Sequence, residues 1–304
     1  MNHIIKMLKT KTILSFIAAY FLLAGNLQAQ GLHQTAKTKF LTVNGIKYAY
    51  RTYGQKSGLP LVLLPHFVGT MDDWDPSLTN ELAKTHLVVI FDNKGVGGSG
   101  GETPSSITQM SEDAVAFIKA LGYQKVDLLG FSMGGFIGQQ IAIDHPGLLR
   151  RLILSGTAPR GGDIADNTPV IENKEKKTAE QMREFLFFTG TDNGIKESKA
   201  FWKRIQERKV DRDPDTKVPA ILAQNKAIQD YTAEKDASFN AIKKITIPVL
   251  IVNGAHDRMD PPSNSLVMVT HMPNAKMIIY PDAGHGSLFQ YSQDFAKQVN
   301  SFLK

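Results

Sequence analysis

A succession of short apolar runs constrains the fold of this chain of 304 residues more than any other feature. Two early runs, residues 39–43 and 47–53, alternate polar and apolar side chains, as strands with one covered face do. The later runs are nearly continuous in Val, Ile and Leu, which is typical of parallel strands covered on both faces. These later runs are residues 59–65, 86–92, 125–131, 150–156, 247–254 and 276–282.

Helical patterns separate the later runs, so the sequence predicts an α/β fold with a mostly parallel sheet and helices on both of its faces. Residues 106–122 form one such helix, whose apolar positions recur on a single face. Ser106 and Gln109 have the spacing of a capping box, and Gly122 is expected to end the helix.

Residues 157–240 interrupt this rhythm because they contain no convincing strand. Three amphipathic patterns, at residues 178–190, 198–209 and 218–231, predict helices separated by polar loops. We therefore expect a core domain formed by residues 30–156 and 241–304, with residues 157–240 inserted into it as a helical cap.

The N-terminus has the pattern of a secretory signal peptide, which we assign to residues 1–29. Three lysines precede the apolar run 13–25, and the small residue Ala29 marks the expected cleavage point. The alternative is an N-terminal membrane anchor, but this run is shorter than the ~20 apolar residues that cross a bilayer. We predict export to the periplasm or the medium, and no stable membrane span in the mature chain.

Composition narrows the possible partners and chemistry. Removal of residues 1–29 deletes three lysines and no acidic residue, which lowers the formal charge from +6 to +3. Because no block of like charge remains, we expect no nucleic-acid partner. The chain has no cysteine, which excludes a thiol nucleophile and thiolate metal ligands. The sequence does not indicate the oligomeric state.

The motif Gly130-Phe131-Ser132-Met133-Gly134 stands where an apolar run gives way to a helical pattern. In a G-x-S-x-G motif at such a place, a sharp turn exposes the serine hydroxyl at the carboxyl end of a strand. A neutral hydroxyl is a poor nucleophile, so it needs a histidine to take its proton and a carboxylate to orient that histidine. Downstream, Asp257 follows one predicted strand and His285 follows the last.

With these three motifs in order, the chain resembles the α/β-hydrolase family from about Lys39 to Lys304. The resemblance implies Ser132 as nucleophile, Asp257 as acid and His285 as base. Asp260 competes with Asp257, but it precedes two prolines and we expect it to cap the next helix.

The resemblance also implies an oxyanion hole formed by two backbone N–H groups, with Met133 as the first donor. Counting back from Trp74 makes Phe67 the second donor. Pro65 and His66 then stand where the family usually has His and Gly, and a shift of one residue in this loop would make Val68 the donor. Whether His66 contacts the substrate or points into the protein is left open.

A second glycine motif, residues 95–100, matches the G-x-G-x-x-G pattern of dinucleotide sites and follows a predicted strand. In such sites the helix begins at the glycines, but here Pro104 delays it, and no acidic residue ends the next strand. The α/β-hydrolase family has a glycine-rich loop at this place, matched by Asp92, Gly95 and Gly97. We therefore predict no organic cofactor and no metal.

The expected activity is that of a serine hydrolase that cleaves a small or medium carboxylic ester or lactone through an acyl-enzyme. Aromatic residues of the cap, Phe187, Phe188 and Trp202, are candidates together with His66 for the pocket of a small acyl substrate. The alternatives are amide or aminopeptidase cleavage, perhydrolysis on the same triad, and a ligand-binding member of the fold without turnover.

Overall fold

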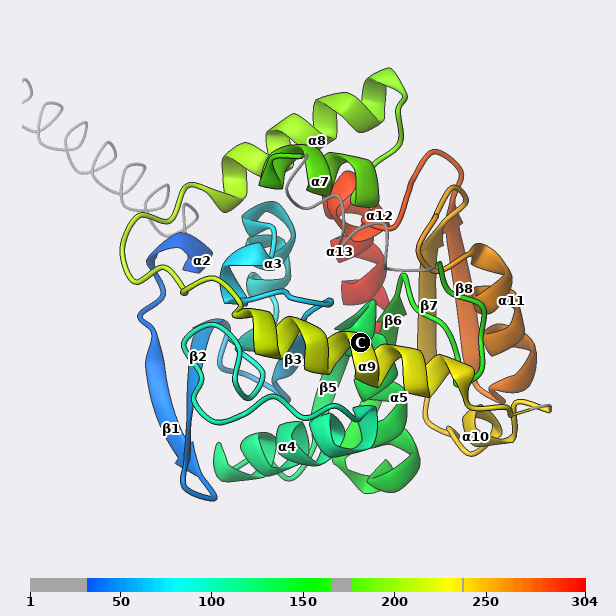
Figure 1. The fold of residues 1–304 in the computed structure, drawn as a ribbon, viewed down its shortest axis with the longest axis horizontal. Helices are drawn as coiled ribbons and strands as arrows, with labels where there is room; N and C mark the ends of the chain where they lie inside the picture. Colours follow the sequence, from blue (N-terminus) through cyan, green and yellow to red (C-terminus); the bar gives the residue numbers. More distant parts are fainter. Residues whose placement is uncertain (1–31, 166–176, 237) are drawn as a thin grey trace, which may run out of the picture.

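The computed structural model describes residues 32–165, 177–236 and 238–304, which form an eight-stranded sheet with helices on both faces (Figure 1). The strand order is β1-β2-β4-β3-β5-β6-β7-β8, in which β1–β2 and β2–β4 are antiparallel and the other pairs are parallel. The strands are β1 (Lys39–Val43), β2 (Ile46–Gly54), β3 (Leu61–Leu64), β4 (Leu87–Phe91), β5 (Val126–Phe131), β6 (Leu149–Ser155), β7 (Val249–Gly254) and β8 (Ala275–Tyr280). The predicted α/β fold is thereby confirmed.

Successive residues of the central strands face opposite cores, which explains why their sequences are apolar throughout. In β3, Val62 and Leu64 belong to one buried cluster, whereas Leu61 and Leu63 belong to the other. All four side chains are fully buried. A polar residue at any of these positions would therefore lie in a core. For this reason β3 lacks the alternation of polar and apolar residues that β1 and β2 show.

Helices α4, α5, α9 and α11 contribute to the first core, and helices α3, α7, α8, α12 and α13 to the second. Figure 1 shows α4, α5 and α9 near the lower part of the view, with α7 and α8 above them. The helices are α2 (Leu32–Thr35), α3 (Pro76–Ala83), α4 (Ile107–Ala120), α5 (Met133–Asp144), α7 (Ala179–Phe187), α8 (Asp192–Ile205), α9 (Val218–Ala233), α10 (Asn240–Lys243), α11 (Pro262–His271), α12 (Ser287–Gln290) and α13 (Ser292–Phe302), with short 3-10 turns at Met71–Asp73 and Pro146–Leu148.

Helices α7, α8 and α9 lie between β6 and β7 in the chain, where the amphipathic patterns predict them. Helix α8 begins earlier than its apolar pattern, because the Thr191 side chain caps it by accepting a hydrogen bond from the Gly194 N–H. We call residues 157–240 the inserted segment. Its role as a cap remains a prediction.

The capping box predicted for α4 is wrong. Ser106 occupies the N-cap position, but its side chain makes no capping hydrogen bond, and Gln109 instead contacts Asp113. Both Ser106 and Gln109 are exposed, so water satisfies the same groups without the box. Gly122 follows the helix with a φ of +91°, as a C-terminal glycine is expected to.

The predicted signal peptide, residues 1–29, lies outside the described residues and stays a prediction. Within the described parts of the chain, no helix is both long and apolar enough to span a membrane.

The turn from β5 into α5 brings backbones into very close contact. Ser132 in this turn has φ 55° and ψ −121°, a strained conformation for a residue with a side chain. A Cβ at Gly130 would lie 2.3 Å from the Gly134 carbonyl oxygen, and one at Gly134 would lie 2.1 Å from the Leu64 oxygen. Both neighbours are backbone atoms, so only glycine fits at either position.

Gly134→Ala should therefore destabilise the fold by about 1–3 kcal/mol, because the added methyl group overlaps the end of β3. The matched control is Gly147→Ala, where no heavy atom lies within 4 Å of the added carbon. This control should change the unfolding free energy by less than about 0.5 kcal/mol. Urea unfolding of both variants measures the difference, and equal effects would contradict the packing argument.

Candidate active site

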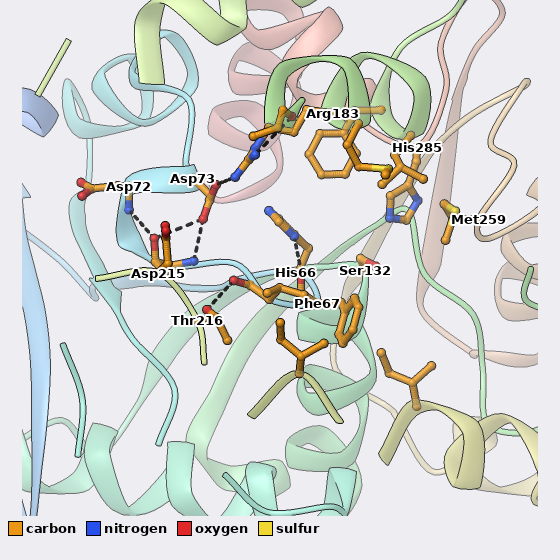
Figure 2. Close-up of a pocket in the computed structure, with 18 of the residues that line it drawn as sticks. His66, Phe67, Asp72, Asp73, Ser132, Arg183, Asp215, Thr216, Met259 and His285 are labelled. Carbon is orange, nitrogen blue, oxygen red and sulfur yellow. Dashed lines mark hydrogen bonds and ion pairs between the residues drawn. The ribbon is translucent and has the colours of Figure 1, made fainter. Parts of the chain in front are cut away.

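Ser132 lies at the carboxyl end of β5 and lines a cavity (Figure 2). Its backbone N–H donates to the Ser155 carbonyl at 2.9 Å, which ties the turn to β6. Its side chain is partly exposed and makes no hydrogen bond to any residue that the structure describes. The hydroxyl is therefore held at the cavity wall by its backbone and is accessible from the cavity.

Asp257 and His285 come from the loops after β7 and β8, and both are buried. His285 Nδ1 lies 3.1 Å and 3.0 Å from the two carboxylate oxygens of Asp257. The backbone N–H groups of Met259 and Asp260 donate to Asp257 Oδ1 at 2.8 and 2.9 Å. These bonds fix the carboxylate, which in turn places the proton of His285 on Nδ1 and leaves Nε2 as the basic nitrogen.

The imidazole of His285 also packs in an aromatic environment, with its ring centroid 5.0 Å from that of Phe131 and 5.9 Å from that of Phe187. His285 and Ser132 line the same cavity, and Figure 2 shows them beside one another. The structure thus brings together the three residues that the sequence predicts as nucleophile, acid and base.

Two opposing effects determine the pKa of His285. Burial disfavours the charged imidazolium, but the charge of Asp257 and its hydrogen bond outweigh this, so the pKa is raised above the ordinary value of 6.5. A base with such a pKa takes up a proton readily, and it is neutral only at pH values above that raised pKa.

Asp260 does not cap α11, so that prediction is wrong. The N-cap position is occupied by Pro261, and the Asp260 side chain turns inward, where it is buried at the cavity wall. Its Oδ2 lies 3.7 Å from His285 Nδ1, and its Oδ1 has no hydrogen-bond partner among the described residues. Burial and the charge of Asp257 raise the pKa of Asp260 to about 8, so Asp260 holds its proton near neutral pH.

The two predicted oxyanion donors have free backbone N–H groups. Met133 is the first residue of α5, and no described residue accepts a hydrogen bond from its N–H or from that of Phe67. The Val68 N–H is engaged, because it donates to Gln224 Oε1 at 2.8 Å. Of the two alternatives in this loop, Phe67 is therefore the one with an available donor.

His66 lines the cavity beside Ser132 (Figure 2). Its Nδ1 lies 2.8 Å from the Phe67 carbonyl oxygen, an acceptor only, so Nδ1 carries the proton. Desolvation lowers the pKa of His66 to about 4, which keeps the ring neutral. Its Nε2 is then a lone-pair acceptor without a partner among the described residues.

The cavity has a volume of about 650 Å³ and two unlike ends. Near Ser132 it is lined by apolar side chains, among them Phe67, Phe136, Leu186, Phe187 and Met259. Away from Ser132, Figure 2 shows Asp72, Asp73 and Asp215, with Arg183 paired to Asp73. Lys177, Arg212 and Asp213 also line the cavity.

The pocket residues proposed from sequence divide in the structure. His66, Phe187 and Trp202 line the cavity. Phe188 does not, because it packs away from the cavity with its ring centroid 5.5 Å from that of Phe201. Adjacent residues near a helix end point in different directions, so a run of aromatic residues cannot all face one cavity.

The glycine loop at residues 95–100 closes around an internal carboxylate. Asp92 Oδ2 accepts from the Gly98 N–H at 2.7 Å, and Asp92 Oδ1 accepts from the Met71 N–H at 2.8 Å. A Cβ at Gly97 would lie 2.3 Å from Asp92 Oδ2, so this glycine allows the close approach. Within residues 32–165, 177–236 and 238–304, no three His, Asp or Glu side chains are placed to hold a metal ion.

Sequence reasoning missed Thr216 and Gln224, which contact the loop that carries Phe67. Thr216 Oγ1 donates to the Val68 carbonyl at 2.8 Å, and Gln224 accepts from the Val68 N–H. Gln224 is fully buried on α9. A polar residue on the apolar side of an amphipathic helix is the only signal that sequence offers for such a contact.

Comparisons with known proteins show which family this chain resembles in sequence and structure. A family model described as alpha/beta hydrolase fold matches residues 60–290. A solved alpha/beta hydrolase fold protein from Chitinophaga pinensis is 39% identical, covers 90% of this chain and 99% of its own, and superposes with a TM-score of 0.86.

Two curated relatives are named for their reactions. A proline iminopeptidase of Pestalotiopsis fici is 26% identical over 88% of this chain and 99% of its own length. A 2-hydroxymuconate semialdehyde hydrolase of a Pseudomonas species is 28% identical over 73% of this chain and 78% of its own length. One of these relatives is named as a peptidase and the other as a hydrolase of a semialdehyde, so their names indicate different substrates.

Replacing Asp257 by Asn should lower the pKa of His285, because it removes the charge that holds the proton on a buried imidazole. In the wild type the imidazole should titrate above 6.5, and in Asp257→Asn the midpoint should fall. The pH dependence of the imidazole NMR signals measures this. Asp230→Asn, at an exposed carboxylate paired with Lys226 on α9, is the control and should leave the midpoint unchanged. A midpoint that is the same in all three proteins would refute the assignment.

Proposed function

The chain belongs to the α/β-hydrolase fold family, and on this premise we propose that it is a serine hydrolase of small or medium carboxylic esters or lactones. One observation carries the proposal: the buried pair of His285 and Asp257, 3.0 Å apart at its shorter contact, opens on the same cavity as the strained Ser132. A histidine oriented by a carboxylate beside an accessible hydroxyl is the arrangement that activates serine.

The proposed reaction proceeds in two halves. The Ser132 oxygen attacks the carbonyl carbon while His285 Nε2 takes the hydroxyl proton, and Asp257 stabilises the imidazolium that forms. The negative charge on the former carbonyl oxygen is met by the N–H groups of Phe67 and Met133. When the carbonyl re-forms, the alcohol leaves with the proton from His285. Water then attacks the acyl-enzyme carbonyl while His285 takes its proton. When the bond to the Ser132 oxygen breaks, His285 gives that proton to the serine oxygen and the acid is released.

The cavity supports an apolar acyl group as the substrate part nearest Ser132. Phenylalanine, leucine and methionine side chains line this end, and burial of a substrate's apolar surface there is favourable by about 25 cal/mol per Å². Helix α7 contributes Met182, Leu186 and Phe187 to this wall, and α9 contributes Ile221 and Leu222. We propose that the inserted segment is a cap that selects the acyl group.

Amide or aminopeptidase cleavage is the second candidate, favoured by the charged end of the cavity. Asp215 lines this end and forms no ion pair with a described residue, so it is available to a cationic substrate group. The similarity to a proline iminopeptidase over most of both chains points in the same direction. The same triad performs both reactions, and only the leaving group differs.

A fluorophosphonate probe should label the wild type and fail to label Ser132→Ala. Ester turnover should fall by at least about 10⁴-fold in this variant, because the nucleophile is gone while binding remains. Ser106→Ala, at an exposed serine that makes no capping bond, is the control and should be labelled like the wild type. A folded wild type that takes up no probe would instead indicate a ligand-binding member of the fold.

A panel of p-nitrophenyl esters, lactones and amino-acid amides separates the two candidate substrate classes. We expect the largest kcat/KM for apolar esters or lactones, falling as pH decreases through the raised pKa of His285, since the protonated imidazole cannot act as a base. A kcat/KM for prolyl or other aminoacyl amides more than tenfold above that for every ester would replace the ester assignment by the aminopeptidase one.

A further inference from the structure

We propose that Thr216 and Gln224 of the inserted segment are positioning residues of the oxyanion hole. In the structure they bond to the N–H and to the carbonyl of Val68. By fixing the backbone of Val68 they also orient the N–H of the preceding residue, Phe67. The inference rests on the proposed function of Ser132 and extends it: the cap completes the catalytic site in addition to lining the cavity.

The loop between β3 and α3 has a backbone conformation that does not suit its sequence. Val68 has a φ of +67°. For a β-branched residue this left-handed region is a genuine outlier, which costs about 1–2 kcal/mol relative to the ordinary regions. Such strain persists only where the surroundings determine the conformation more strongly than the residue itself does.

Both contacts on Val68 come from the inserted segment. Its N–H donates to Gln224 Oε1 and its carbonyl accepts from Thr216 Oγ1, each at 2.8 Å. These two bonds fix the peptide groups on either side of Val68. The first of them is the Phe67–Val68 peptide, whose carbonyl is also held by His66 Nδ1 at 2.8 Å. The orientation of Phe67 therefore depends on the contacts of its neighbour.

Gln224 is committed to this contact. Its side chain is fully buried, and its Nε2 has no hydrogen-bond partner among the described residues. An orphaned amide donor costs about 1–3 kcal/mol. A buried leucine would avoid that cost, so the amide at this position is explained by the bond that its oxygen accepts.

A buried ion network holds the chain three residues before Thr216. The backbone N–H of Asp213 donates to Asp72 Oδ2 at 2.7 Å, and that of Asp72 donates to Asp213 Oδ2 at 3.1 Å. Arg51, fully buried on β2, pairs with Asp72 at 2.6 Å and with Asp213 at 3.0 Å. This network joins β2, the turn Met71–Asp73 that follows the predicted oxyanion loop, and the loop between α8 and α9 that carries Thr216.

The residue at the strained position explains why the contacts are needed. Position 68 holds a valine, and the first glycine of this loop is Gly69. The left-handed conformation therefore falls on a valine, where glycine would adopt it without strain. The hydrogen bonds of Thr216 and Gln224 offset the strain that a glycine would have avoided.

Gln224→Met and Thr216→Val test the proposal, because each removes one bond while keeping a similar side-chain volume. We expect kcat on an ester to fall about 10- to 100-fold, less than the 10²–10³-fold loss on removal of an oxyanion donor itself. KM should change less than about threefold, because the ground-state carbonyl depends little on these donors. The Ki of a trifluoromethyl ketone, whose adduct carries an oxyanion, should rise in parallel with the loss in kcat.

Matched controls on α9 are Gln229→Met, at an exposed glutamine, and Thr232→Val, whose hydroxyl bonds only within the helix. Both should keep wild-type kcat and Ki. Gln224→Glu retains an acceptor oxygen and should recover most of the lost kcat. Adding Val68→Gly to Gln224→Met should also recover part of it, because glycine populates the left-handed region unaided.

Amide hydrogen exchange supplies a readout that needs no catalysis: the Val68 N–H should exchange faster in Gln224→Met than in Gln229→Met. Unchanged exchange overturns the proposal. So does a kcat within twofold of wild type in both Gln224→Met and Thr216→Val, or a loss of kcat without a matching rise in Ki. If the wild type itself neither takes up the fluorophosphonate nor hydrolyses any ester, the proposed function fails first, and the catalytic role of these residues fails with it.

Discussion

Parallel pairing of β5, β6, β7 and β8 is the constraint on which the candidate site depends. Because these strands run in the same direction, the loops that follow them lie at one edge of the sheet. Ser132 follows β5, Asp257 follows β7 and His285 follows β8. Residues separated by more than a hundred positions in the chain meet because the strands that carry them run in the same direction.

At that edge, two acids three positions apart in the chain have different hydrogen-bond surroundings. Asp257 accepts two backbone N–H groups and faces Nδ1 of His285, so its oxygens are satisfied as a carboxylate. Asp260 has one oxygen without a partner among the described residues, and burial, together with the charge of Asp257, raises its pKa.

Much of this arrangement could be predicted from sequence, because apolar runs and glycine spacing reflect local requirements. Every run assigned as a strand forms one, and Ser132, Asp257 and His285 follow from motifs at strand ends. The errors concern residues whose environment is tertiary. Asp260 resembles a cap by its position before proline, yet it turns into the cavity; Ser106 and Gln109 have the spacing of a capping box, yet both remain in water. The contacts of Gln224 join residues 156 positions apart, and no local pattern encodes them.

Within one turn of helix α9, some residues line the cavity and another bonds to the loop that carries Phe67. Ile221 and Leu222 line the cavity, and Gln224 bonds to the loop beside Ser132. A chimaera that carries the corresponding helix of a relative would have a different set of cavity residues. It would also lose the hydrogen bond from the Val68 N–H to Gln224. If the chain acts as proposed, selectivity and turnover share this helix, so protein engineers would have to keep residue 224 fixed while they vary the positions around it.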